Sequence, residues 1–381
     1  SGLTIFSFGV FILPLAEEFG WSRGEISVAS SFLIFANAVT APIVGSLVDR
    51  FGARRIAITS MCCLGIGYLA LSQMPPKLML FYVIYLALAF AGGGTTNVVW
   101  TRTINLRFDR ARGTALGLIL AGSGSAAIFA PVLCTQVITA AGWRWGYAAI
   151  GLSMLLLPAP VLLLFFRETA TARASATVAD EPGYSLRESL SRPAYWKLAG
   201  SFFLVSTCVS SIIVHTVPML ADRGMTPMQA AGTAGLFGIA IVVGRLIDGA
   251  LVDRFHAPVI GTVLFCISAA GCLLLTYGGS EHWVSTLAVV TFGLAGGAEV
   301  HLLAFLTSRY FGMRAYGKIY GLQLMSFYAA ASIGPLLTGL GYDAAHSYRP
   351  VLIAAAILFT AGGAILATLG RYPSFSPRTA G

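Results

Sequence analysis

Charged side chains are scarce in this chain. Of its 381 residues, 10% are charged and 57% are hydrophobic, whereas a soluble domain carries about 25% charged residues. The charges gather between apolar runs of about 20 residues, the length at which a helix crosses a lipid bilayer. The composition therefore excludes a soluble domain and predicts a polytopic helical protein embedded in a lipid bilayer. We attribute the net charge of +9 to basic cytoplasmic loops and not to a surface for nucleic acid.

Cysteines and catalytic patterns are equally sparse. The six cysteines lie in apolar runs without the spacing of a disulfide framework or a metal site, so we expect small buried side chains there. No nucleophile–base spacing, phosphate loop or metal-ligand cluster appears in the sequence. We therefore expect that the protein is not an enzyme and binds no cofactor and no metal.

The apolar runs predict twelve membrane-spanning helices. The expected spans are 2–19, 26–48, 55–74, 78–101, 112–138, 145–166, 196–219, 228–252, 257–277, 284–308, 316–340 and 348–370. The longest polar stretch, from Arg167 to Arg192, separates the sixth span from the seventh. Most of the 24 Lys and Arg residues lie in loops after even-numbered spans. By the positive-inside rule we expect both termini and this linker in the cytoplasm, with the spans in the inner (plasma) membrane.

The second half of the chain repeats the first at a constant offset of 204 residues. The stretch GSLVDRFGA, which begins at Gly45, reads against GALVDRFHA, which begins at Gly249. Further pairs with the same offset are Pro14 with Pro218, Gly20 with Gly224, Gly92 with Gly296 and Pro131 with Pro335. Each half holds six spans, an even number, so both halves cross the membrane in the same orientation. Two such halves predict a pseudo-twofold axis along the membrane normal and a cavity between them.

The paired motifs carry a family resemblance. The two copies of Gly-x-Leu-x-Asp-Arg resemble motif A of the major facilitator superfamily, and the six-plus-six layout is similar to that of its members. The resemblance implies an all-α membrane protein of two six-helix bundles, residues 1–166 and 194–372, joined by a cytoplasmic linker (167–193) and followed by a cytoplasmic tail (373–381). It also implies a gating latch at the cytoplasmic face, made by Gly45, Asp49, Arg50, Gly249, Asp253 and Arg254. Ordinary positive-inside topology is the alternative explanation of these basic residues.

Within that superfamily the chain resembles the monocarboxylate transporters and the oxalate/formate antiporters. The stretches that carry this resemblance are 20–26, 112–117, 142–144, 308–312 and 316–321. Those groups bind substrate through an arginine of the eighth span in an Arg-x-x-x-Gly setting, and Arg245 matches that position. The chain departs from the animal transporters at Ile241, where they have an acid, and near Phe6, where they have a lysine. It also has no internal lysine in span eleven, where oxalate transport relies on a second cation, so the departures favour a monoanion.

Arg245 itself lies inside an apolar run, roughly 12 Å of helix before Asp253 and so near the middle of the bilayer. An unpaired guanidinium is costly at that depth, so it needs an acid or an anionic ligand. A carboxylate suits it because the planar fork donates two parallel hydrogen bonds. Asp248, three residues further on, shares its helix face. It offers the alternative, a structural pair that never meets substrate.

The two halves differ at several titratable residues inside the spans, which are candidates for proton coupling. Glu299 in an apolar setting is our first candidate, with a buried structural hydrogen bond as the alternative. Asp248 carries a proton, neutralises Arg245 or makes a gating contact. His301 and His215 titrate in a useful range, although lone histidines in helices are more often satisfied core residues. Glu299 and His301 are two residues apart, so on a helix they point in roughly opposite directions.

These observations predict a secondary transporter of a small organic monocarboxylate. We expect it to work as a monomer, in symport with a proton, by rocker-switch alternating access. Candidate substrate contacts besides Arg245 are Gln323, Tyr328 and Asn97. The main alternative is an organic-anion exchanger of the oxalate/formate type. A drug/proton antiporter would more often centre an acid in the first half, and a transporter-like sensor would add a large signalling segment, so both are less favoured.

Overall fold

The computed structural model of the chain describes residues 2–95, 112–157, 160, 183–252, 254–279, 281–312 and 314–373. Within its helices, the side chains at 37–38, 41–43, 45–46, 48–50, 53 and 112–124 are not described. The regular structure of the described ranges is helical, apart from one isolated bridge between Gly183 and Gly312. This agrees with the all-helical prediction.

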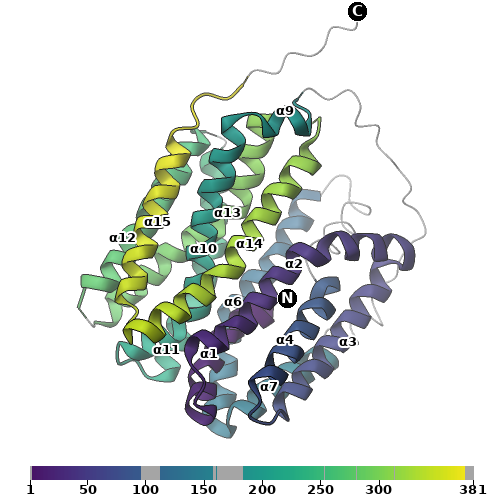
Figure 1. Cartoon of the computed structure of the whole chain (residues 1–381), viewed down its shortest axis with the longest axis vertical. Coiled ribbons are helices and arrows are strands. Elements are labelled where there is room, and N and C mark those ends of the chain that lie inside the picture. The colour runs from purple at the N-terminus through teal and green to yellow at the C-terminus, as the bar shows by residue number, and fades with distance from the viewer. Residues whose placement is uncertain are drawn as a thin grey trace, which may run out of the picture. The chain divides into compact units, whose positions relative to one another are not determined.

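The first half of the described chain forms long apolar helices (Figure 1). They are α1 (Gly2–Phe19), α2 (Arg23–Phe51), α3 (Ala53–Ser72), α4 (Leu78–Ala91), the 3₁₀ turn η1 (Gly92–Thr95), α6 (Arg112–Ala141) and α7 (Trp143–Leu156). The first and third helices match the expected spans 2–19 and 55–74 within two residues. The expected span 78–101 is described as far as Thr95, where α4 has passed into the tighter turn η1.

The second half begins with a short helix and continues with longer ones. They are α9 (Leu186–Leu190), α10 (Pro193–Asp222), α11 (Pro227–Val252), α12 (Ala257–Tyr277), α13 (His282–Phe311), α14 (Tyr316–Ala345) and α15 (Arg349–Ala367). In the described part of the chain, nine helices are long and apolar enough to cross a membrane. Several exceed the predicted spans at their ends, because helices such as α10 and α13 continue for 30 residues.

The sequence repeat is also visible in the backbone. The turns before α2 and α11 each contain a glycine with positive φ, 68° at Gly20 and 86° at Gly224. The turns after α6 and α14 contain a second pair, Gly142 at 88° and His346 at 49°. His346 is the one described residue other than glycine with a positive φ, so the repeat imposes this conformation where the sequence no longer supplies glycine.

The same offset relates two helix caps. At the start of α2, Ser22 and Glu25 exchange hydrogen bonds between side chain and backbone, at 2.8 and 3.1 Å. At the start of α11, Thr226 and Gln229 do the same at 3.0 and 3.3 Å. Each pair is a capping box, which satisfies two backbone N–H groups that the helix leaves unpaired. The two halves are therefore related in local structure as well as in sequence.

The Cα positions divide the chain into two compact units. The first unit contains Ser1–Ala172, Ser210–Ile239 and Ser332–Tyr348, and the second contains Arg173–Val209, Ala240–Ala331 and Arg349–Gly381. The first unit thus includes one end of α10, of α11 and of α14 together with the helices of the first half. The boundaries at 166 and 194, which assume two separate six-helix bundles, stay a prediction.

Small residues allow the helices of the first unit to approach closely. A Cβ atom at Gly9 of α1 would collide with the Val214 carbonyl of α10. A Cβ atom at Gly238 of α11 would lie 2.6 Å from the Ile128 backbone nitrogen of α6. Segments of both sequence halves therefore pack backbone against backbone within this unit.

Aromatic residues fill the interior of the first-half helices. The ring of Phe11 stacks on Tyr147 with centroids 3.9 Å apart, and the hydroxyls of Tyr85 and Tyr147 are hydrogen-bonded at 3.0 Å. These three side chains are at most 1% exposed. Because the polar ends of both tyrosines are satisfied by each other, the cluster can be buried without an unpaired group.

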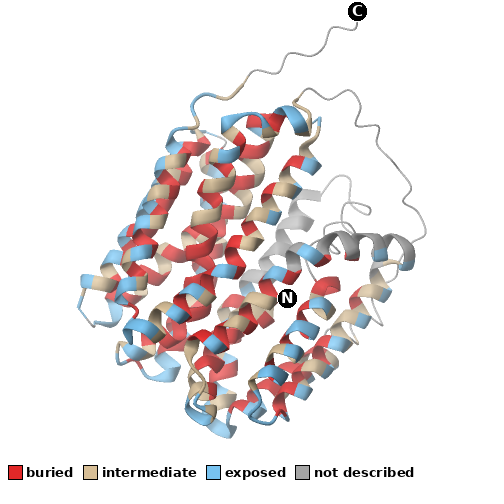
Figure 2. Ribbon diagram, in the orientation of Figure 1, coloured by how far each residue is buried: buried red, intermediate tan, exposed pale blue. Residues whose placement is uncertain are grey.

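In the second unit, α12 lies beside α15 and α13 (Figure 1). Buried residues run along almost the whole of α13, from Val284 to Phe311 (Figure 2). This helix is therefore enclosed on most of its circumference, and polar side chains on it have neighbouring helices as their surroundings. That environment sets the chemistry of the buried Glu299, whereas His301 is partly exposed.

A substitution at the contact between α3 and α7 tests the role of close helix packing. A Cβ atom at Gly151 would lie 2.7 Å from the Gly65 carbonyl oxygen. We expect Gly151→Val to lower the thermal unfolding temperature of the purified protein, because overpacking costs about 1–3 kcal/mol. The control is Gly200→Ala in α10, where a Cβ atom meets nothing within 4 Å. The Gly200→Ala protein should unfold at the wild-type temperature or above it. Equal unfolding temperatures for Gly151→Val and Gly200→Ala would contradict the close contact between α3 and α7.

Candidate functional site

The candidate site lies where α11 packs against α13 in the second unit. A Cβ atom at Gly244 of α11 would lie 2.5 Å from the Leu294 carbonyl oxygen, and one at Gly297 of α13 would collide with the Ile241 carbonyl. The two glycines let the helix backbones touch. The side chains that follow them, at 245 and 248 on α11 and at 301 on α13, are thereby brought into contact with the neighbouring helix.

Arg245 lies half-buried on α11. Its Nε donates to the Gly297 carbonyl oxygen at 3.5 Å, the outer limit of a hydrogen bond. None of the ion pairs in the described residues includes Arg245. This part of α11 therefore carries a guanidinium that forms no ion pair with a described carboxylate.

Asp248 has a different partner from the one that the helix spacing suggested. Its side chain is fully buried, and its Oδ2 lies 2.6 Å from Nδ1 of His301 on α13. The structure does not bring Asp248 and Arg245 together, although they are three residues apart. The imidazole on the neighbouring helix is the partner because the close α11–α13 contact directs Asp248 towards α13.

The Asp248–His301 pair is incomplete on one side and accessible on the other. The second carboxylate oxygen of Asp248, Oδ1, is buried without a hydrogen-bond partner in the described structure. The side chain of His301 is 40% exposed, whereas that of Asp248 is 0% exposed. The imidazole is therefore the exposed member of the pair and the carboxylate the buried one. The pair's role in coupling stays a prediction.

Glu299 faces a different part of the second unit. It is 6% exposed, and its Oε2 has no hydrogen-bond partner among the described residues. Its carboxyl group is close enough to Tyr328 of α14 and Cys208 of α10 for electrostatic interaction. Glu299 and His301 thus have different neighbours, as their spacing of two residues predicts. Whether Glu299 carries a proton or makes a structural hydrogen bond through its other oxygen stays a prediction.

Gln323 lies inside the bundle, where it is 1% exposed. Its Oε1 accepts a hydrogen bond from Thr307 of α13 at 2.6 Å, and its Nε2 has no partner in the described structure. Tyr328 is half-buried, with its ring edge-to-face against Phe327. Both remain candidates for substrate contact, and Gln323 retains two free N–H donors.

His215 lies in the first unit, whereas Asp248, Glu299 and His301 lie in the second. It is fully buried in α10, and its ring nitrogens are within hydrogen-bond distance of Ser27, Tyr348 and Pro335. These contacts agree with the alternative that His215 is a satisfied core residue. Sequence reasoning missed this network because its members are 120 to 188 residues apart.

Part of the predicted site falls outside the described residues. Asn97 and Asp253 are not described, and neither are the side chains of Asp49 and Arg50 in α2. Gly45 lies within α2 and Gly249 within α11, and the exposed Arg254 follows the end of α11. The motif A latch stays a prediction.

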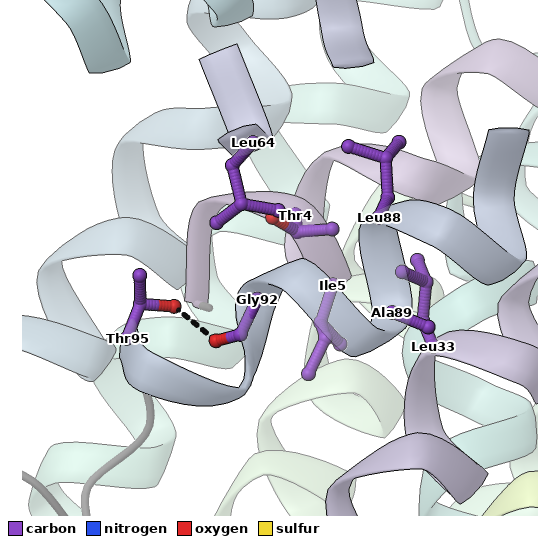
Figure 3. Close-up of a pocket in the computed structure, with 8 residues that line it drawn as sticks. All are labelled: Thr4, Ile5, Leu33, Leu64, Leu88, Ala89, Gly92 and Thr95. Carbon is purple, nitrogen blue, oxygen red and sulfur yellow. Dashed lines mark hydrogen bonds between the residues drawn. The ribbon is translucent and has the colours of Figure 1, made fainter. Parts of the chain in front are cut away.

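The first unit contains a small pocket between α1, α2, α3, α4 and η1 that the sequence did not indicate (Figure 3). Its lining residues are Thr4, Ile5, Leu33, Leu64, Leu88, Ala89, Gly92 and Thr95. The Thr95 hydroxyl donates to the Gly92 carbonyl at 2.8 Å. With no ionisable side chain in its lining, this pocket suits an apolar group and not a carboxylate.

The fold and the site together define a membrane transporter of the two-repeat helical class. Repeated apolar helices, a half-buried arginine and buried acids fit a polar pathway through the bilayer. The chain belongs to the Major Facilitator Superfamily, whose family model matches residues 1–335. The predicted family and fold class are thereby confirmed, and the protein is a multi-pass membrane protein.

Alignments with similar proteins cover almost the whole chain. A transporter of Bacillus subtilis, the uncharacterized MFS-type transporter YcxA, is 25% identical over 377 residues, which is 94% of this chain and 89% of that protein. Monocarboxylate transporter 13 of Bos taurus is 26% identical over 378 residues, or 98% of this chain and 87% of the relative.

Solved structures share the fold at lower sequence identity. A bacterial homologue of the human lysosomal transporter Spinster, in an inward-facing and occupied conformation, has a TM-score of 0.72 and 15% identity over 97% of this chain and 92% of its own. The nucleoside transporter NupG has a TM-score of 0.78 and 13% identity over 97% of this chain and 99% of its own.

A double-mutant cycle tests the Asp248–His301 contact. We expect Asp248→Asn and His301→Gln each to destabilise the purified protein, and their combined effect to fall short of the sum by about 1–3 kcal/mol, because the second change removes a contact already lost.

His282→Ala, at the exposed start of the same helix, is the matched control. Combined with Asp248→Asn it should be additive within about 0.5 kcal/mol. Additive effects for Asp248→Asn with His301→Gln would show that the two side chains do not interact.

Proposed function

We propose that this transporter moves a small organic monocarboxylate together with a proton by alternating access, and that Arg245 binds the carboxylate. The observation that carries the proposal is the guanidinium of Arg245 inside an apolar helix, with no neutralising carboxylate in the described part of the chain. A substrate anion supplies the missing charge.

The geometry of the guanidinium supports a carboxylate as the anion. Nε is engaged, weakly, with the Gly297 carbonyl, which leaves the terminal nitrogens for a substrate. A planar carboxylate accepts two parallel hydrogen bonds from such a fork, and in a site with little water these bonds are stronger than in solution. A single central cation suits a monoanion better than a dianion.

A relative supports the same substrate class. The Bos taurus protein at 26% identity is named a monocarboxylate transporter. In this chain, Arg245 stands in the Arg-x-x-x-Gly setting through which the resemblance to that group implies substrate binding. At this identity the substrate is a proposal, and it rests on Arg245 more than on the relative.

Asp248 and Glu299 are the two candidate proton carriers, and the exposure of their surroundings favours Asp248. The Asp248–His301 pair lies one helical turn from Arg245 along α11 and has an exposed imidazole. Glu299 is buried on the other side of α13. We assign the proton to the Asp248–His301 pair, with Glu299 as the alternative carrier. Movement of a carboxylate with one proton carries no net charge across the membrane.

Uptake into proteoliposomes tests the role of Arg245. The panel is radiolabelled lactate, pyruvate, acetate, formate, oxalate and an aromatic acid, with and without an inward proton gradient. We expect gradient-stimulated uptake of one or more monocarboxylates. Arg245→Ala should reduce the initial rate at low substrate about 100-fold, because a charge-assisted hydrogen-bond pair is lost.

Arg245→Lys should recover only part of the rate, because a lysine lacks the two-pronged fork. Arg187→Ala, which removes an exposed arginine of α9, should leave uptake unchanged. Uptake that survives in folded Arg245→Ala protein would refute the proposal. Uptake that requires an anion inside and ignores the proton gradient would identify an exchanger.

Neutral variants of the acids test the proton carrier. We expect Asp248→Asn to abolish accumulation driven by the proton gradient and to preserve exchange of labelled for unlabelled substrate, because exchange needs no net proton movement. Glu299→Gln should keep both activities. The opposite result, with accumulation lost only in Glu299→Gln, would transfer the role to Glu299. Accumulation in both variants would remove both acids from the mechanism.

A further inference from the structure

Arg23, at the start of α2, binds two segments of the second sequence half within the first unit. Its terminal nitrogens donate two hydrogen bonds to the carboxylate of Asp222 at the end of α10, both at 2.9 Å. One of them also donates to the Tyr348 hydroxyl at 3.0 Å. The guanidinium lies over the ring of Tyr342 in α14, 3.8 Å from the centroid. These side-chain contacts all join Arg23, in the first sequence half, to residues of the second half.

The backbone at the same point is also held across the halves. The carboxylate of Asp343 in α14 accepts the backbone N–H of Arg23 at 3.1 Å and that of Gly24 at 2.8 Å. An acid at this position satisfies unpaired N–H groups of α2 and is favoured by the positive end of the helix dipole. Beside it, Gly339 of α14 faces Gly24 so closely that an added Cβ atom would lie 2.7 Å from the Gly24 Cα.

His215 of α10 completes this network with a defined hydrogen-bond pattern. The Pro335 carbonyl can only accept, so Nε2, at 3.0 Å from it, carries the proton. Nδ1 lies 3.0 Å from the Tyr348 hydroxyl, within hydrogen-bond distance. The Tyr348 oxygen in turn accepts from Arg23. His215 thus supports the position in which Tyr348 meets Arg23.

The sequence repeat shows what is special about this contact. Asp222 is the counterpart of Glu18 at the offset of 204. Glu18 binds Arg144 of its own half, with the two side chains 2.5 Å apart. The counterpart of Arg144 is Tyr348, which has no charge to offer Asp222. Asp222 is therefore neutralised by Arg23 from the other half.

We propose that Arg23 is a gating residue of the transport cycle. Its ion pair with Asp222, together with the Asp343 cap on α2, forms a latch that closes one end of the first unit and must break before substrate enters or leaves there. Alternating access requires the two halves to separate at each end in turn. Charge-assisted hydrogen bonds hold the closed state, and partial exposure, 12% for Arg23 and 32% for Asp222, lets water replace them on opening. The latch contains neither Arg245 nor the Asp248–His301 pair.

Thr216 of α10 provides a reporter of the gate. It is 4% exposed and lines an apolar cavity of the first unit with Phe6, Ala127 and Phe237, residues of both sequence halves. A cysteine there is protected while the end is closed. The test labels Thr216→Cys protein in membrane vesicles with a membrane-impermeant maleimide, applied to each side in turn and without substrate. Protein with only the native cysteines gives the background.

We expect Arg23→Gln and Asp222→Asn each to raise the labelling rate of Thr216→Cys about tenfold from one side of the membrane, since a charge-assisted pair is worth about 1.5 kcal/mol or more. Glu18→Gln is the matched control, because it removes an ion pair of the same kind that lies within one half. Its labelling rate should equal that of the parent.

Gly339→Ala supplies a second route to the same result. The added methyl group collides with the α2 backbone and leaves every charged residue in place, so it should also raise the labelling rate. Thermal unfolding of each variant establishes that it is folded. Unchanged labelling in folded Arg23→Gln and Asp222→Asn proteins would overturn the latch, as would equal acceleration by Glu18→Gln. Failure of monocarboxylate uptake would leave these outcomes unaffected.

Discussion

The inability of a lipid bilayer to solvate charge is the constraint on which the polar site depends. Asp248, Glu299 and Arg245 of the candidate site would all be charged in water, and each meets the constraint differently. Asp248 pairs with His301 across the α11–α13 contact. Glu299 is buried with an unpartnered oxygen, which is tolerable for a neutral carboxylic acid but not for an anion. Arg245 cannot lose its proton under any ordinary condition, and no carboxylate in the described part of the chain forms an ion pair with it. That difference is the basis of the proposal that Arg245 binds the substrate.

Much of the fold could be predicted from the sequence because it depends on local rules. Apolar run length located the helices, and the offset of 204 residues anticipated the turns at Gly20 and Gly224. The prolines at 14, 131, 218 and 335 all lie inside helices, in the pairs that the repeat predicts. Such features need only neighbouring residues, a helix period and the membrane thickness.

The pairing of the polar side chains could not be predicted in the same way. Helix spacing put Asp248 on the face of Arg245, but the partner of Asp248 lies 53 residues away, on a helix brought into contact by two glycines. The network of His215 joins residues from α2, α10 and α14. These contacts depend on which helices are neighbours, and no local pattern encodes that choice. The sequence shows that Tyr348 occupies the repeat position of Arg144. That Arg23 replaces the missing charge could be seen only from the position of Arg23 in the structure.

The exposure of the latch has a consequence for the environment in which the protein works. Ions of the surrounding medium can approach Arg23 and Asp222, and at physiological ionic strength charges are screened over about 8 Å. Salt on that side of the membrane weakens the pair in proportion to its exposure, 12% for Arg23 and 32% for Asp222, because partly buried charges are screened less than exposed ones. In the proposed cycle, the balance between the closed and open forms therefore depends on the ionic strength of the compartment that this end of the protein faces.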